Sequence, residues 1–179
     1  MSFESGKNMA GIGALLLVIG SFVPFLSLVG IILLLLGLRD LAQHYNDNSI
    51  FQNSLYALIF GLIGIVAAGV VLVSFFLSGF SGGSLGWTGL ILVLFVAFIF
   101  YVLMAVYFRR TFDSLADKSG QGMFKTAGLL LLIGAILTIV IIGLVLIFVA
   151  WILATVAFFQ MTPAAALQPS TPPPPPPQA

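Results

Sequence analysis

The 179-residue chain has 61% hydrophobic and only 6% charged residues, against about 45–50% and about 25% in a typical globular domain. So few charged side chains cannot cover a water-facing surface, which excludes a soluble domain and predicts an all-α, polytopic transmembrane helical bundle with the lipid bilayer as its first partner. Six basic residues nearly balance five acidic ones, so nucleic acid is not an expected partner. Without cysteine, the chain has no disulfide, thiolate nucleophile or cysteine zinc site.

Three stretches contain no Asp, Glu, Lys or Arg: residues 8–38, 48–108 and 126–179. Since a backbone in lipid must satisfy its own hydrogen bonds, these stretches are expected to form helices. The middle stretch divides at the glycine- and serine-rich segment 79–86, which predicts a turn between helices at about 50–77 and 87–108. Ser49 and Gln52 have the spacing of a capping box at the start of the first of these helices.

Each outer stretch is longer than the roughly 20 residues that cross a bilayer. It forms either one long tilted helix or a hairpin of two short helices, with Pro24 or Thr138 near the turn. The hairpin alternative gives six spans, at about 9–23, 25–44, 50–77, 87–108, 121–137 and 139–160, and it puts all six basic and five acidic residues on one side. The positive-inside rule then places that side, and both termini, in the cytoplasm. We therefore favour six spans in the cell membrane, with a cytoplasmic N-terminus at 1–8; four spans are the alternative.

The two outer stretches resemble each other, which predicts an internal repeat of two hairpins that flank the central one. Leu15–Gly20 matches Leu129–Gly134, and small residues stay aligned after a one-residue slip at Pro24. Small residues let membrane helices approach closely. We therefore expect helix packing at the aligned small residues and at a further stripe in the middle stretch: Gly13, Gly20, Gly30 and Gly37; Ala127, Gly134, Gly143 and Ala150; Ala57, Gly61, Gly64 and Ala68.

A first charged segment contains Asp40, His44 and Asp47, which would share one face of a helix that continued past His44. Imidazole and carboxylate groups on one face can hold a divalent metal. The alternative is a solvated helix end without metal. We favour it, because His44 is the chain's single histidine.

A second charged segment, residues 108–120, carries an apolar stripe of Phe108, Phe112 and Leu115. Such a stripe is typical of a helix that leaves the membrane and lies on its surface, and Gly120 would end that helix. Arg109 and Arg110 are then either contacts for lipid headgroups or simple anchors of the topology.

The membrane-embedded parts of the predicted spans hold no charged residue, although coupled transporters need such groups there. Neither a catalytic triad nor a phosphate-binding loop is present in the sequence. We therefore expect no enzyme activity, no cofactor and no coupled transport. The tail of residues 161–179, with its run of prolines from Pro172 to Pro177, is expected to be a disordered polyproline II segment. It would serve either as a spacer or as a docking site for a cytoplasmic partner.

Residues 11–17, 20–24, 110–112, 119–120 and 124–128 resemble a family of small prokaryotic membrane proteins, many of them archaeal: the domain-of-unknown-function family numbered 996. The resemblance covers about Lys7 to Gln160. That family has no established activity, so the resemblance implies a membrane helical fold and assigns no functional residue.

Two functions remain open on the sequence. The first is a non-catalytic scaffold or interaction protein that associates through its small-residue helix faces, with a second copy or another membrane protein as partner. The alternative is a passive channel or uniporter for a small solute, with a narrow path lined by hydroxyl groups.

Overall fold

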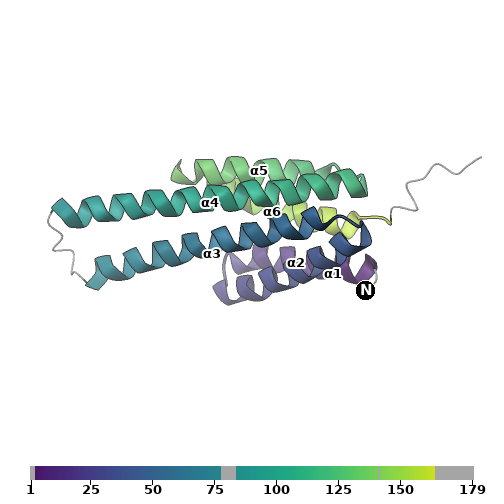
Figure 1. The fold of residues 1–179 in the computed structure, drawn as a ribbon, viewed down its shortest axis with the longest axis horizontal. Coiled ribbons are helices and arrows are strands. Elements are labelled where there is room, and N and C mark those ends of the chain that lie inside the picture. Colours follow the sequence, from purple (N-terminus) through teal and green to yellow (C-terminus); the bar gives the residue numbers. More distant parts are fainter. Residues whose placement is uncertain (1–2, 78–83, 141, 164–179) are drawn as a thin grey trace, which may run out of the picture.

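The computed structural model of the chain describes residues 3–77, 84–140 and 142–163. Within these ranges the fold is all-helical, and its helices pair as three antiparallel hairpins, α1–α2, α3–α4 and α5–α6 (Figure 1). The elements are α1 (Phe3–Gly20), α2 (Pro24–His44), α3 (Asn48–Leu77), α4 (Ser84–Ser119), α5 (Met123–Leu137), the 3-10 helix η1 (Thr138–Val140) and α6 (Ile142–Gln160). Five of them, α2 to α6 with η1 extending α5, are long and apolar enough to cross a membrane. The prediction of an all-α membrane protein is confirmed at this level.

Both outer stretches of the chain form hairpins, and neither forms the single long helix that was the alternative. The first stretch turns between Gly20 and Pro24. Proline has a fixed φ and no backbone N–H, so it suits the first turn of α2. The second stretch turns after the short helix η1. The proline-rich tail from residue 164 onward and most of the predicted glycine/serine turn lie outside the described residues.

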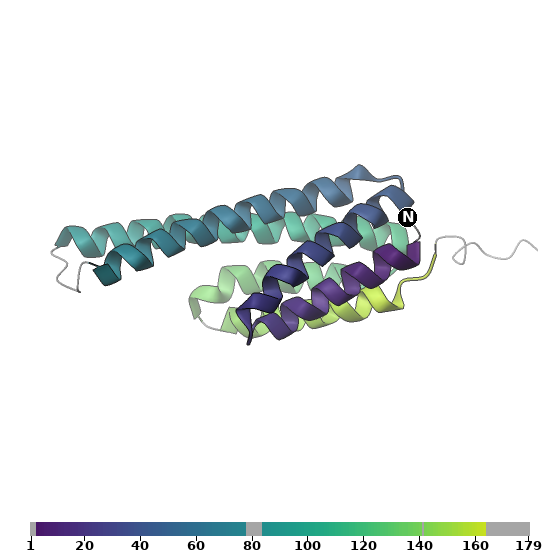
Figure 2. The same ribbon diagram turned by 90° about the horizontal axis from the view of Figure 1, so that it is seen from below.

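The central hairpin is longer than the two outer ones. Helices α3 and α4 contain 30 and 36 residues, whereas α1, α2, α5 and α6 contain 18, 21, 15 and 19. All three hairpins share one end, and at the other end α3 and α4 extend past the outer hairpins (Figure 2). Helix α4 continues through residue 108 to Ser119, and Gly120 ends it with a positive φ of 72°.

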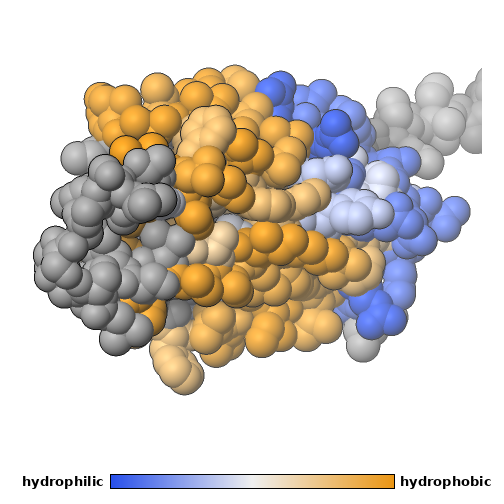
Figure 3. Space-filling model, turned by 60° about the vertical axis from the view of Figure 1, so that its left-hand side comes forward, coloured by the Kyte–Doolittle hydropathy of each residue, from blue (hydrophilic) through white to orange (hydrophobic). Residues whose placement is uncertain are grey.

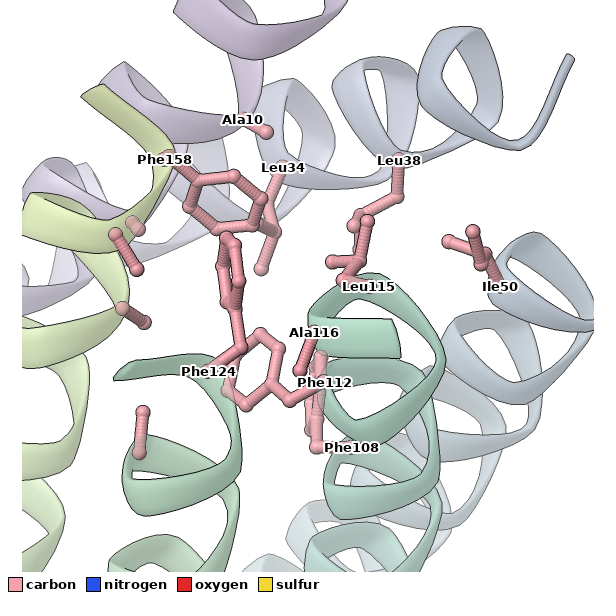
Figure 4. Packing of buried hydrophobic residues seen from close by; sticks show 14 of the residues in the cluster. Ala10, Leu34, Leu38, Ile50, Phe108, Phe112, Leu115, Ala116, Phe124 and Phe158 are labelled. Atoms are coloured by element: carbon pink, nitrogen blue, oxygen red, sulfur yellow. The ribbon is translucent and has the colours of Figure 1, made fainter. Parts of the chain in front are cut away.

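The buried core lies at the shared end, where the three hairpins meet (Figure 4). Phe112 contacts Phe124 of α5 and Phe158 of α6 at ring-centroid distances of 5.8 and 6.4 Å. The predicted surface stripe belongs to this core, because Phe108, Phe112 and Leu115 are at most 2% exposed. The prediction of a helix lying on the membrane surface is therefore wrong. The helix α4 runs straight on, and α2, α5 and α6 cover its apolar stripe.

Within the outer hairpins the helices contact each other backbone to backbone at small residues. A Cβ added to Gly13 would meet the backbone of Leu34 and lie 2.7 Å from the carbonyl oxygen of Gly30. The hairpin α5–α6 has the same kind of contact between Gly134 and Gly143. These pairs are not equivalent in the predicted repeat, which aligns Gly20, and not Gly13, with Gly134. The first hairpin turns directly after Gly20, whereas the second continues past Gly134 through Leu137 and η1 before it turns.

Candidate functional site

The charged residues gather at one end of the molecule, and on the face seen in Figure 3 the described surface away from that end is apolar. Four ion pairs occur among them in the described part of the chain; Lys118 of α4 pairs with Asp47 between α2 and α3 (3.7 Å), and Lys125 of α5 pairs with Asp117 of α4 (2.7 Å). At least one partner in each pair is more than two-fifths exposed, and exposed ion pairs contribute little to stability because water screens them. Lys7 also donates a hydrogen bond to the carbonyl oxygen of Met161 (3.2 Å), which ties the start of α1 to the end of α6. The ordinary role of such a face is to stay in water.

The three metal candidates do not form one helix face. Helix α2 ends at His44, and Asn46 adopts a left-handed φ of 50°. Asp47 then lies outside α2 and caps α3: its Oδ1 accepts hydrogen bonds from the backbone N–H (3.0 Å) and the hydroxyl (2.6 Å) of Ser49. The capping residue of α3 is therefore Asp47, and the prediction that Ser49 caps it is wrong. The hydrogen bond from the Ser49 hydroxyl lowers the pKa of Asp47 most, and the Ser49 backbone N–H and Lys118 lower it further, whereas partial burial opposes them; the net shift is downward.

The other two candidates have apolar surroundings. His44 packs against Phe3 with ring centroids 4.9 Å apart. Asp40 is 8% exposed, close to Gly6 of α1, and its Oδ2 has no hydrogen-bond partner among the described residues. Across residues 3–77, 84–140 and 142–163, no three His, Cys, Asp or Glu side chains come together as metal ligands would.

The two candidate headgroup contacts differ in their surroundings. Arg109 forms an ion pair with Asp113 (3.7 Å) in its own helix, and its Cα lies near Gly128 of α5. The guanidinium of Arg110 lies over the ring of Tyr107, 5.2 Å from its centroid. Contact of either arginine with lipid phosphate stays a prediction.

Three hydroxyl groups in the apolar region donate to carbonyl groups four residues earlier in the chain. Ser21 donates to Leu17 (3.3 Å) and Thr138 to Gly134 (2.9 Å). Thr155 donates to Trp151 (2.8 Å). A hydroxyl in this state is already satisfied, which is the usual condition of Ser and Thr in a membrane helix.

The predicted packing residues divide into two groups. Gly13, Gly20, Gly30, Gly37, Gly134 and Gly143 have neighbouring helix backbone or side chains within 3.0 Å of an added Cβ, and Ala150 is buried. The stripe on α3 is packed less closely. A Cβ on Gly64 would lie 3.4 Å from its neighbours on α4, and a Cβ on Gly61 would approach only the flexible side chain of Met104.

This looser stripe lines an apolar groove of about 400 Å³. Small residues form one wall from α3 and part of the opposite wall from α4: Gly61, Gly64, Ala68 and Ala97. Tyr101 of α4, Thr138 of η1 and Leu144 of α6 complete the lining, so the groove lies beside the tip of the α5–α6 hairpin. The sequence predicts the small-residue stripe on α3. It does not indicate that the other helices of the chain leave a groove open along this stripe.

Comparison with known proteins gives a family without an assigned activity. The family model described as "Protein of unknown function (DUF996)" matches residues 26–152. An uncharacterised protein of the archaeon Methanocaldococcus jannaschii is 30% identical over 166 residues, which cover 90% of this chain and 94% of that protein. No solved structure matches the chain.

Proposed function

The chain belongs to the DUF996 family of proteins of unknown function, and we propose that it is a non-catalytic membrane scaffold that self-associates through the groove along α3. The charged residues at the shared end pair mostly with one another or with backbone groups, and the hydroxyls of Ser21, Thr138 and Thr155 donate to backbone carbonyl groups one turn earlier. Neither set resembles groups poised for reaction with a substrate. These features support a structural role.

The observation that carries the proposal is the groove formed by Gly61, Gly64, Ala68 and Ala97. Lipid tails are as apolar as leucine, so membrane helices associate where small residues allow close van der Waals packing. In the outer hairpins such residues already contact their own chain. The α3 stripe has free space beside it, and a helix from a second copy would fill that space better than flexible lipid tails.

The same proposal assigns an orientation. The shared charged end carries every Lys and Arg of the chain, and the positive-inside rule places such an end in the cytoplasm. The hairpin pairing then brings residues 3 and 163, the two ends of the described chain, to the cytoplasmic side.

The test compares two substitutions to leucine on helix α3. A68L fills the groove, whereas V66L changes a residue that is 62% exposed on the same helix and does not line it. Purified protein in mild detergent should form a discrete oligomer, measured by light scattering during gel filtration. A68L should weaken the association by about tenfold or more, the equivalent of about 1.4 kcal/mol, and V66L should leave it unchanged. A monomer at every concentration, or equal effects of both substitutions, would contradict the proposal.

A further inference from the structure

The three hairpins reach different depths from their shared charged end. From the last charged or amide residue, the apolar parts of α3 (Ser54–Leu77) and α4 (Ser84–Phe108) extend about 36–38 Å at 1.5 Å per residue. The corresponding parts of α1 (Asn8–Gly20) and α2 (Pro24–Leu38) extend only about 20–22 Å. Helix α5 with η1 reaches about 24 Å and α6 about 27 Å by the same measure. A bilayer has a hydrocarbon core of about 30 Å, so one flat layer cannot match both lengths.

The far parts of α3 and α4 determine where the hydrocarbon layer must be. Their exposed side chains are aliphatic: Val70 and Val73 on α3 are 61% and 58% exposed, and Ile91 and Leu92 on α4 are 66% and 61% exposed. Placing this surface in water would cost about 25 cal/mol for every Å² of apolar area. The far ends of α3 and α4 therefore lie within the hydrocarbon or at its far boundary, well beyond the tips of the outer hairpins (Figure 2).

The tips of the outer hairpins are themselves apolar. Phe22 and Phe25 at the α1–α2 tip are each 79% exposed, and Ile139 at the α5–α6 tip is 74% exposed. Neither tip contains a charged residue. A turn that reached the far surface would place these rings and aliphatic chains among headgroups or in water.

The backbone of the first tip is also suited to lipid. The N–H groups of Ser21, Phe22 and Val23 donate to carbonyl groups of Val18 and Ile19 at 3.0–3.3 Å. Irregular backbone inside a membrane is costly unless such groups are paired. The pairing of these three N–H groups lowers the cost of placing this turn in hydrocarbon.

From these observations we propose that the outer hairpins enter and leave the bilayer through its charged-side face and end inside the hydrocarbon, so that only α3 and α4 cross it completely. This arrangement has two complete spans, where the sequence predicts six and where five helices are long and apolar enough to cross a membrane when their charged-end residues are counted. Six helices then fill the charged-side leaflet and continue past the bilayer midplane, but only α3 and α4 reach the far boundary of the opposite leaflet. The protein is a wedge, and its partner is a curved bilayer whose charged-side leaflet is the convex one.

The depth of the tips can be measured with single cysteines, because the chain has none of its own. Cysteines replace Phe22 and Ile139 at the tips, Ser81 between α3 and α4, and the exposed Asn46 at the charged end. A charged, impermeant maleimide is applied to each face of sealed membrane vesicles in turn. N46C should react from one face and S81C from the other. F22C and I139C should react at least about tenfold more slowly than either from both faces, because a charged reagent is excluded from hydrocarbon.

A nitroxide attached at the same tip cysteines distinguishes lipid from tight protein packing. Its relaxation should respond more to oxygen, which concentrates in hydrocarbon, than to a water-soluble nickel complex. If F22C and I139C react from the S81C face as fast as S81C does, or their nitroxides respond mainly to nickel, the hairpins cross the membrane and the proposal is wrong.

The wedge has a separate consequence for membrane shape. Fluorescently labelled protein, reconstituted with its charged end outward, should reach a higher density per lipid in small sonicated vesicles than in large extruded ones. An equal density in both would overturn the wedge. This result does not depend on self-association, since A68L should sort in the same way as the unchanged chain.

Discussion

Replacing Gly13 with alanine tests whether the outer hairpins are held together by direct backbone contact. The new methyl group would lie 2.7 Å from the Gly30 carbonyl oxygen and 2.8 Å from the Leu34 Cα, whereas carbon atoms pack best at about 3.5–4.0 Å. Both neighbours are backbone atoms of α2, so no side chain can rotate away. The two helices must separate by roughly 1 Å, which loses about a quarter to a half of the dispersion energy along the contact.

The expected cost follows from two opposing effects. Overpacking of this kind costs about 1–3 kcal/mol, while replacing glycine by alanine inside a helix gains up to about 1 kcal/mol. G13A should therefore destabilise the protein by up to about 2 kcal/mol. At Gly69 on α3, no atom lies within 4 Å of an added Cβ. G69A should show only the gain, so the two substitutions should have opposite signs.

Unfolding in detergent micelles by increasing fractions of SDS, followed by tryptophan fluorescence, measures this difference. Circular dichroism of both variants before titration should match that of the unchanged chain. If G13A and G69A shift the midpoint in the same direction and by similar amounts, the close contact between α1 and α2 does not exist in the folded protein.

Three further predictions concern the charged end and can be measured by the same unfolding assay. F112A should cost about 3–5 kcal/mol, because it removes a fully buried ring between Phe124 and Phe158; a loss under about 1 kcal/mol would contradict the core described here. N46V should cost about 1–2 kcal/mol, since a branched side chain fits poorly at a φ of 50°, and an unchanged midpoint would argue against that turn. The hydrogen bond from Ser49 lowers the pKa of Asp47, so this carboxylate stabilises the fold fully above its ordinary pKa of 3.8 and loses that effect as the pH falls through the lower, folded-state value. D47N should therefore flatten the acidic part of the stability profile, and an unchanged profile would mean that Asp47 does not cap α3.

Some of this structure could be predicted because its signals are local. Gly120 follows an apolar and charged helix pattern, and it ends α4 with a positive φ. The break between α2 and α3 also had a local signal that the metal hypothesis overlooked. The run Asn46-Asp47-Asn48-Ser49 is typical of a turn followed by an N-cap. Because this run ends the helix, Asp40, His44 and Asp47 do not share one helix face.

The surface helix was mispredicted because its signal has two meanings. An apolar stripe at helical spacing faces either lipid headgroups or a protein core. At Phe112 the choice depends on Phe124 and Phe158, which arrive from α5 and α6 and leave its ring without exposed area. No pattern within residues 108–120 contains that information.

Two kinds of contact explain the unequal shape of the molecule. Glycine contacts hold the α1–α2 hairpin together along its length, from Gly37 near the charged end to Gly20 near the tip, and they join α5 to α6 at Gly134 and Gly143 near the tip. Contacts between hairpins depend instead on large side chains such as Phe108 and Phe158, and these lie at the shared end. Beyond them, α3 and α4 have mainly each other and lipid as neighbours. Packing between hairpins is therefore strongest where water-facing charges fix the depth of the protein. Toward the far boundary of the opposite leaflet only the central pair remains, which is the geometry that a wedge requires.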